Sequence, residues 1–114
     1  MRIRPVASRK DLNAFLELPY KLYKNDPLWA PPLRYEQRGQ FDPTRTPLLE
    51  HCQWQLFLLE DDGQVTGRIA AFIDTLAVDF WRDPIGLFGY YECGSGQSGG
   101  RLLLEAARTW LRER

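Results

Sequence analysis

The stretch WQLFLLEDDGQVTGRIAAFID, residues 54–74, predicts the centre of the fold. Residues 54–60 and 65–74 are rich in the aliphatic, aromatic and β-branched residues that favour strands. Between them, Asp62 and Gly63 form the Asp-Gly pair that is typical of a tight chain reversal. We therefore expect an antiparallel β-hairpin here.

The segment before the hairpin predicts one short strand and one helix. Residues 2–6 form an extended start, and Ser8 is typical of a helix N-cap because its hydroxyl can accept a hydrogen bond from the first turn. Apolar residues then recur at helical spacing as far as Tyr23. Pro19 lacks an amide donor and crowds the preceding turn, so we expect this helix to kink or break near Leu18.

Prolines dominate the long segment 25–51. They alternate with apolar and aromatic residues, so no long regular structure is expected there, although a short helix is predicted over 33–40. Because its aromatic residues are of a usually buried type, we expect the segment to be held against a surface.

The sequence after the hairpin predicts a strand and a final helix. Turn-forming residues occupy 79–84, and a strand over 85–92 contains interior glycines that suggest a bulge or the close approach of another group. A glycine-rich loop, 94–100, leads into an amphipathic helix over 101–114. The positions expected to form the buried stripe of this helix are Leu103, Ala106, Ala107, Trp110 and Leu111.

These elements predict an α+β fold in one domain, residues 1–114. Its mostly antiparallel sheet has about four strands, with an N-terminal helical region, a long proline-rich loop and a C-terminal amphipathic helix. The chain stops at a helix without a C-cap residue. We therefore expect a truncated domain that lacks C-terminal strands and whose last strand presents an open edge.

Composition narrows the class of partner. The 15 Lys and Arg residues balance the 15 Asp and Glu residues, which removes the electrostatic reason to expect nucleic acid or an anionic membrane as partner. Cys52 and Cys93 are too few for a disulfide framework and belong to no metal-binding motif, so no metal is expected. With neither a signal peptide nor a long apolar stretch, we expect a cytoplasmic protein with reduced thiols.

Four strings of residues resemble a known superfamily. They are LPY at 18–20, LYKNDPLWAPPLR at 22–34, GRIAA at 67–71 and FGYYE at 88–92. Together with the predicted element order, they resemble the N-terminal half of the GNAT N-acetyltransferase superfamily, in a bacterial subgroup of uncharacterised substrate. The string rich in proline and tryptophan is the most specific, because such residues in a fixed order rarely arise from composition alone.

The resemblance implies a site for acetyl-coenzyme A as co-substrate. In GNAT folds the pantetheine arm pairs with exposed backbone of the fourth strand, which corresponds here to Tyr90, Tyr91, Glu92 and Cys93. The diphosphate rests on amides at the start of the next helix, which correspond to Gln97, Ser98, Gly99, Gly100 and Arg101. Helix N-termini suit phosphate because they present unpaired N–H groups and a positive dipole end.

The glycine signature of the superfamily, Gln/Arg-x-x-Gly-x-Gly/Ala, fits this chain incompletely in two registers. A start at Gln97 places Gly100 fourth but Leu102 sixth. A start at Ser95 places Gly100 sixth and matches neither the first nor the fourth position. The stretch therefore has two interpretations, a phosphate cradle and a flexible connection between strand and helix.

Two residues near this stretch have possible chemical roles. Glu92 is a candidate general base that would take the proton of an amine before acyl transfer, and the alternative is an ordinary acidic residue at a strand end. Cys93 has no histidine near it in sequence, and transfer in GNAT enzymes is direct, so we expect a small buried residue rather than a nucleophile.

The leading hypothesis is an acyl-CoA-dependent N-acyltransferase, or the N-terminal part of one. It would move an acetyl group from acetyl-CoA to the amine of a small molecule or a protein. The alternative is a non-catalytic GNAT-like module that binds a partner, or forms a homodimer, through the open sheet edge.

Overall fold

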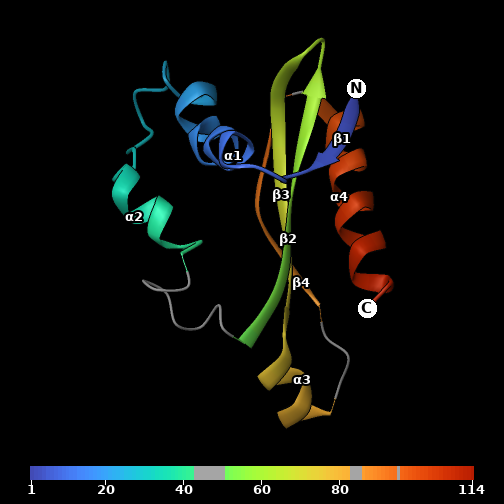
Figure 1. Cartoon of the computed structure of the whole chain (residues 1–114). Helices are drawn as coiled ribbons and strands as arrows, with labels where there is room; N and C mark the ends of the chain where they lie inside the picture. The colour runs from blue at the N-terminus through green and yellow to red at the C-terminus, as the bar shows by residue number, and fades with distance from the viewer. Residues whose placement is uncertain (43–50, 83–85, 95) are drawn as a thin grey trace.

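The computed structural model describes residues 1–42, 51–82, 86–94 and 96–114. A single four-stranded antiparallel sheet has the strand order β1-β2-β3-β4. Helix α4 covers one face, α1 packs on the other, and α2 lies beside α1 on its outer side (Figure 1). The predicted α+β class and the antiparallel sheet are confirmed. The elements are β1 (Arg2–Pro5), α1 (Arg9–Leu22), α2 (Arg34–Gly39), β2 (Cys52–Asp61), β3 (Gln64–Asp74), α3 (Thr75–Trp81), β4 (Leu87–Cys93) and α4 (Gly96–Arg112).

The predicted hairpin is formed by β2 and β3, which pair along their whole length. Asp61 pairs with Gln64 across the turn. Asp62 and Gly63 both have positive φ angles, of 52° and 77°, as a two-residue hairpin turn of this hand requires. Glycine adopts this backbone without strain, which explains why an Asp-Gly pair occupies the turn.

Helix α1 begins as predicted and runs without interruption to Leu22. The Ser8 hydroxyl accepts a hydrogen bond from the amide of Asp11 at 3.1 Å. We expected a kink or a break near Leu18. A break is wrong, because the helix runs on through Pro19 to Leu22. Pro19 cannot donate to the carbonyl of Phe15, four residues earlier, but the Arg68 guanidinium donates to that carbonyl at 2.8 Å.

The proline-rich segment lies partly against α1. The predicted short helix is confirmed as α2, and residues 43–50 lie outside the described residues. The Trp29 ring packs edge-on against Tyr20, and Phe41 is buried beside Trp54. Leu28 and Leu33 are exposed, so only some of the apolar residues are held against the protein as expected.

Two helical regions differ from the sequence prediction. Helix α3 was not predicted, because seven residues are too few to show a helical period; the Asp74 carboxylate accepts a hydrogen bond from the Leu76 amide at its start. Helix α4 begins at Gly96, so the expected loop over 94–100 is wrong from that residue on. Burial of Gly99 and Gly100 explains this result, since tertiary packing overrides the weak helix propensity of glycine.

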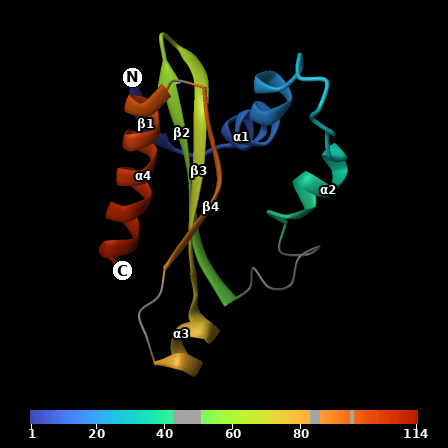
Figure 2. The ribbon, with the colours of Figure 1, turned by 180° about the vertical axis from the view of Figure 1, so that it is seen from behind.

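The sheet separates two hydrophobic cores (Figure 2). On the α1 side, Phe15 and Leu16 pack against Leu56, Leu58 and Ala70. On the α4 side, the predicted stripe is confirmed for three of its five residues, which pack on strands β2 and β3, whereas Ala106 and Leu111 are only half-buried. The buried α4-side residues are Leu103, Ala107, Trp110, Leu59, Ile69 and Ala71.

Strand β4 is an edge of the sheet. It pairs with β3 on one side, and no other described strand pairs with it. Ile85, which was expected to begin this strand, lies outside the described residues. Leu87 and Phe88 are each 58% exposed at its start, so this edge carries apolar surface. Among the described residues, none of the helices is long and apolar enough to cross a membrane.

Candidate functional site at the bulge of β4

A β-bulge divides β4 in the middle. Arg68 pairs with Glu92, but Ala70 pairs with Gly89, so Tyr90 and Tyr91 together lie opposite the single residue Ile69. At the bulge, Tyr90 has a left-handed backbone conformation, with a φ of 56°. The expectation of a bulge in this strand is confirmed. Gly89 pairs with Ala70 and Glu92 with Arg68, so the extra residue brings Gly89 and Glu92, three positions apart, to the same α1 side of the sheet. The Tyr90 ring also lies on that side, against Phe15.

Arg68 is buried in the centre of the α1 side, with 4% of its surface exposed. Its Nε donates to the carbonyl of Tyr90 at 3.0 Å, and its Nη1 donates to the carbonyl of Phe15 at 2.8 Å. Burial lowers the pKa of Arg68, and the nearby Glu92 carboxylate opposes that change. The guanidinium stays charged, because arginine is not deprotonated in proteins.

Glu92 has a partner from the end of α1. The hydroxyl of Tyr23, which is the C-cap residue of α1, donates a hydrogen bond to Glu92 Oε2. This bond, with a further contribution from burial, raises the pKa of Tyr23 above its ordinary value, because the phenolate could not make the bond. This hydrogen bond joins the end of α1 to β4.

The side chain of Tyr90 is held by contacts within the protein. Its ring packs against Phe41 at 4.9 Å and Phe15 at 6.4 Å between ring centroids, and its hydroxyl donates to Gln40 Oε1 at 2.7 Å. Burial raises the pKa of Tyr90. Only its backbone could serve the predicted pantetheine contact.

The remaining predicted residues lie on the α4 side. Tyr91 lines a surface hollow whose other residues are Gln97, Gly100, Arg101, Leu104 and Glu105. Its hydroxyl lies so close to Gly100 that a Cβ atom at position 100 would require the Tyr91 side chain to move. Cys93 is half-buried against the α4-side core, so it is less buried than expected.

The first turn of α4 lies at one end of this hollow. Gln97 and Ser98 are in that turn, whose amide groups have no acceptor within the helix. Gly99 and Gly100 are buried, and Arg101 is exposed. The structure therefore groups Tyr91, Gln97, Gly100 and Arg101, and it places Glu92 on the opposite face of the sheet.

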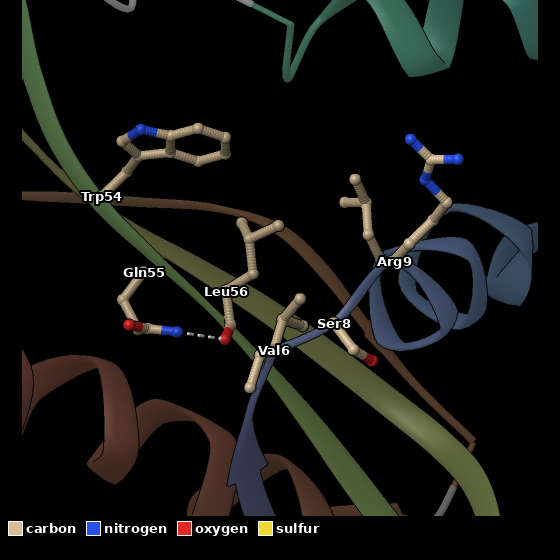
Figure 3. A pocket seen from close by; sticks show the side chains of 8 residues that line it. Val6, Ser8, Arg9, Trp54, Gln55 and Leu56 are labelled. Atoms are coloured by element: carbon tan, nitrogen blue, oxygen red, sulfur yellow. Dashed lines mark hydrogen bonds between the residues drawn. The ribbon is translucent and has the colours of Figure 1, made fainter.

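Two further hollows differ in chemistry. An almost entirely apolar hollow of about 330 Å³ between β4 and α4 is lined by Phe88, Leu104, Ala107, Arg108 and Leu111; it shares Leu104 with the hollow at Tyr91. The second lies at the junction of β1 and α1 with β2, where Figure 3 shows Trp54 and Arg9 on different sides of it. Because β3 separates β2 from β4, this second hollow is remote from the predicted site.

Sequence reasoning missed Arg68 and Tyr23. Arg68 could have been found, because it is the only charged residue in the apolar run 65–73 of a central strand. Tyr23 could not, because 69 residues separate it from Glu92 and only the fold brings the two together.

Comparison with known proteins gives two relatives. Protein YghO of Escherichia coli (strain K12) is 34% identical over 110 residues, which are 96% of this chain and 28% of that protein. Bacterial ceramide synthase of Caulobacter vibrioides (strain NA1000 / CB15N) is 33% identical over 115 residues, which are 100% of this chain and 30% of that protein. The chain thus spans less than a third of the length of these relatives. No protein-family model and no solved structure matches the chain, so the resemblance to the GNAT superfamily stays a prediction.

Proposed function

We propose that this chain forms the acyl-CoA-binding part of an N-acyltransferase of the GNAT type. The observation that carries the proposal is the bulged, unpaired edge of β4, which leads directly into the first turn of α4 and bears the Tyr23–Glu92 pair. An extended pantetheine arm can add to an open strand edge through backbone hydrogen bonds. The diphosphate would lie at the amides of Gln97 and Ser98, beside the exposed Arg101.

The name of one relative supports the reaction type. A ceramide is a long-chain amino alcohol that carries a fatty acyl group on its nitrogen, so a ceramide synthase makes an amide. For this chain we propose the same class of reaction, with an amine as acceptor. The amine nitrogen attacks the thioester carbonyl carbon, a C–N bond forms, the C–S bond breaks, and coenzyme A leaves as a thiolate.

Glu92 would be the general base of that step. Its carboxylate would take the proton that the attacking amine loses, and the departing thiolate would take up a proton from solvent. Glu92 projects on the α1 side, whereas the hollow at Tyr91 is on the α4 side. A ligand along the edge of β4 can reach both faces, because no described strand covers that edge.

The apolar hollow between β4 and α4 supports acyl groups longer than acetyl. Phe88, Leu104 and Leu111 line it, and it shares Leu104 with the hollow at Tyr91. Each methylene group that it buries contributes about 0.8 kcal/mol. We therefore propose a medium or long acyl chain as the favoured donor, with acetyl as the shortest.

The test is ligand-induced thermal stabilisation of the chain by acetyl-CoA, octanoyl-CoA and free coenzyme A. A ligand that binds only the folded state raises the melting temperature. We expect the largest rise with octanoyl-CoA, and we expect Leu104→Glu to remove the advantage of octanoyl over acetyl. Thr109→Glu, on an exposed part of the same helix, is the matched control.

A second pair of variants tests the phosphate end. Arg101→Ala should weaken binding of all three ligands about tenfold, since a charge-assisted contact to phosphate is lost, whereas Arg112→Ala should leave it unchanged. No stabilisation by any of the ligands at millimolar concentration would refute the proposal.

The exposed edge also favours a second candidate function, a binding or dimerisation module. Leu87 and Phe88 are both 58% exposed beside an unpaired strand edge, which suits strand addition by a second copy. Sedimentation equilibrium should then show a dimer that Phe88→Lys dissociates. A monomer at every concentration would contradict this candidate.

A further inference from the structure

We propose that Arg68 is a positioning residue that replaces the amide N–H missing at Pro19 and fixes α1 to the bulge of β4. This inference rests on the proposed function only where Glu92 is taken as the general base. Its structural part concerns two backbone carbonyl groups, those of Phe15 and Tyr90, which accept hydrogen bonds from the same buried guanidinium.

The first carbonyl belongs to α1. In an α-helix the amide of residue 19 would donate to the carbonyl of Phe15, and proline at 19 has no such amide. Phe15 is fully buried, so its carbonyl has no access to bulk water. Arg68 Nη1 donates to it at 2.8 Å from a different element of the fold. A buried acceptor that the proline would leave unpaired is satisfied in this way.

The second carbonyl belongs to the bulge. Tyr90 has a φ of 56°, a left-handed backbone that is unfavourable for a residue with a large side chain. Arg68 Nε donates to its carbonyl at 3.0 Å. The guanidinium also lies 4.8 Å from the centre of the Phe15 ring, which adds a cation–π contact on the α1 side.

The planar guanidinium therefore sets the relation between α1 and β4. Its two donor atoms have fixed directions, so the two carbonyls cannot shift independently. Tyr23 follows α1 at its end, and Glu92 directly follows the bulge formed by Tyr90 and Tyr91. The hydrogen bond between Tyr23 and Glu92 depends on the relation between α1 and β4. Lysine could keep the charge at position 68, but it lacks the planar pair of donors.

The proposal is tested first by a double-mutant cycle between Arg68→Met and Pro19→Ala. Arg68→Met leaves both carbonyls without this donor and should lower the urea midpoint strongly. In the Pro19→Ala background, the increase that Arg68→Met causes in the unfolding equilibrium constant should be about five- to tenfold smaller than in the unmodified chain. The reason is that the amide that alanine restores at position 19 can donate to the Phe15 carbonyl. Lys21→Ala, at an exposed position of the same helix, is the control background and should show additive losses.

A second readout separates positioning from stability. The Cζ NMR resonance of Tyr23, assigned by its absence in Tyr23→Phe, reports its hydrogen bond to Glu92. In the double variant stability should recover in part, but this resonance should still move toward the position of a free tyrosine, because the Tyr90 carbonyl remains unpaired. Arg68→Lys should give an intermediate shift.

The outcomes distinguish this inference from the proposed function. If Arg68→Met does not fold, recovery of folded protein by Pro19→Ala is the positive result. Equal losses in both backgrounds, or a Tyr23 resonance that does not move in the double variant, would overturn the role of Arg68. Absence of acyl-CoA binding to the unmodified chain would instead refute the proposed function and leave this cycle intact.

Discussion

The two faces of the sheet are built on different principles. On the α4 side, Ile69 and Ala71 pack against Leu103 and Ala107 in an apolar cluster. On the α1 side, the neighbouring residue Arg68 is as well buried, yet it is charged and bonded to backbone carbonyls. One strand, β3, thus contributes apolar residues to the cores on both sides and adds a buried charged network on the α1 side.

This difference assigns packing to the α4 side of the sheet and the proposed base to the α1 side. An apolar core tolerates approximate replacements, whereas each member of a buried polar network needs its particular partner. The proposed base, Glu92, lies on the networked side, and the hollow at Tyr91 lies on the other. The bulge at Tyr90 connects the two sides, because it decides which residues of β4 face α1.

The largest effect is expected from the apolar side. Leu103→Ala removes a fully buried side chain and should destabilise the fold by about 2–5 kcal/mol, through lost burial and a cavity. Urea unfolding measures the change, and Leu102→Ala, at an exposed neighbouring position, is the control. The Tyr23 resonance should not move; a shift would show that the two faces are not independent.

A smaller loss on the same side is expected from Gly67→Ala. A Cβ at position 67 would lie 2.8 Å from Leu103 Cδ1 and 3.2 Å from Leu59 Cβ, so it would overpack the α4 side by about 1–3 kcal/mol. Combined with Leu103→Ala, which removes the nearest atom, the loss should be less than additive. Additive losses in urea unfolding would contradict this account of the packing.

Tyr23→Phe tests the networked side. It removes one hydrogen bond and should cost about 0.5–1.5 kcal/mol at neutral pH. Because the pKa of Tyr23 in the folded protein is raised above its ordinary value of 10.0, its contribution is complete below pH 10 and is lost as the pH rises through the folded value. The stabilities of the two proteins should therefore converge in alkali, as urea unfolding at several pH values can check.

The smallest effect is expected where β1 meets α1. Arg4 bonds to Asp11 at 2.6 Å and also to Glu60, and these bonds lower the pKa of both carboxyl groups from their ordinary values of 3.8 and 4.5. Depressed values stabilise the fold above the unfolded pKa, and this stabilisation is lost as the pH falls through the folded value.

Arg4→Met should therefore reduce the loss of stability below about pH 4.5, relative to the unmodified chain. The exposed variant Arg9→Met is the control. Thermal melting between pH 7 and pH 3 provides the measurement. The same acid dependence in both variants would show that Arg4 does not carry the effect.

Much of the fold followed from local patterns. The hairpin came from two hydrophobic runs around an Asp-Gly pair, and the buried stripe of α4 came from its helical period. The start of α4 did not, because Gly99 and Gly100 have low helix propensity and become helical only by packing. Helix α3 was missed because seven residues carry too little periodic signal.

Of the candidate site, the sequence supplied residue types and the fold supplied their arrangement. The resemblance to the GNAT superfamily pointed to Glu92 and to the start of the last helix, but it gave Glu92 no partner. The partner, Tyr23, is distant in sequence. Alternation along the strand separates Glu92 from Tyr91, and the bulge decides that Glu92 is the one that faces α1.

The sequence by itself determined the hairpin, the capped first helix and the amphipathic last helix, since periodicity, capping and turn chemistry act over a few residues. Only the tertiary structure decided that α1 would continue through Pro19, because the replacement donor, Arg68, comes from a strand 49 positions further along the chain. Hydrogen bonds between distant residues depend on where the packed elements bring their atoms, and no local pattern encodes that.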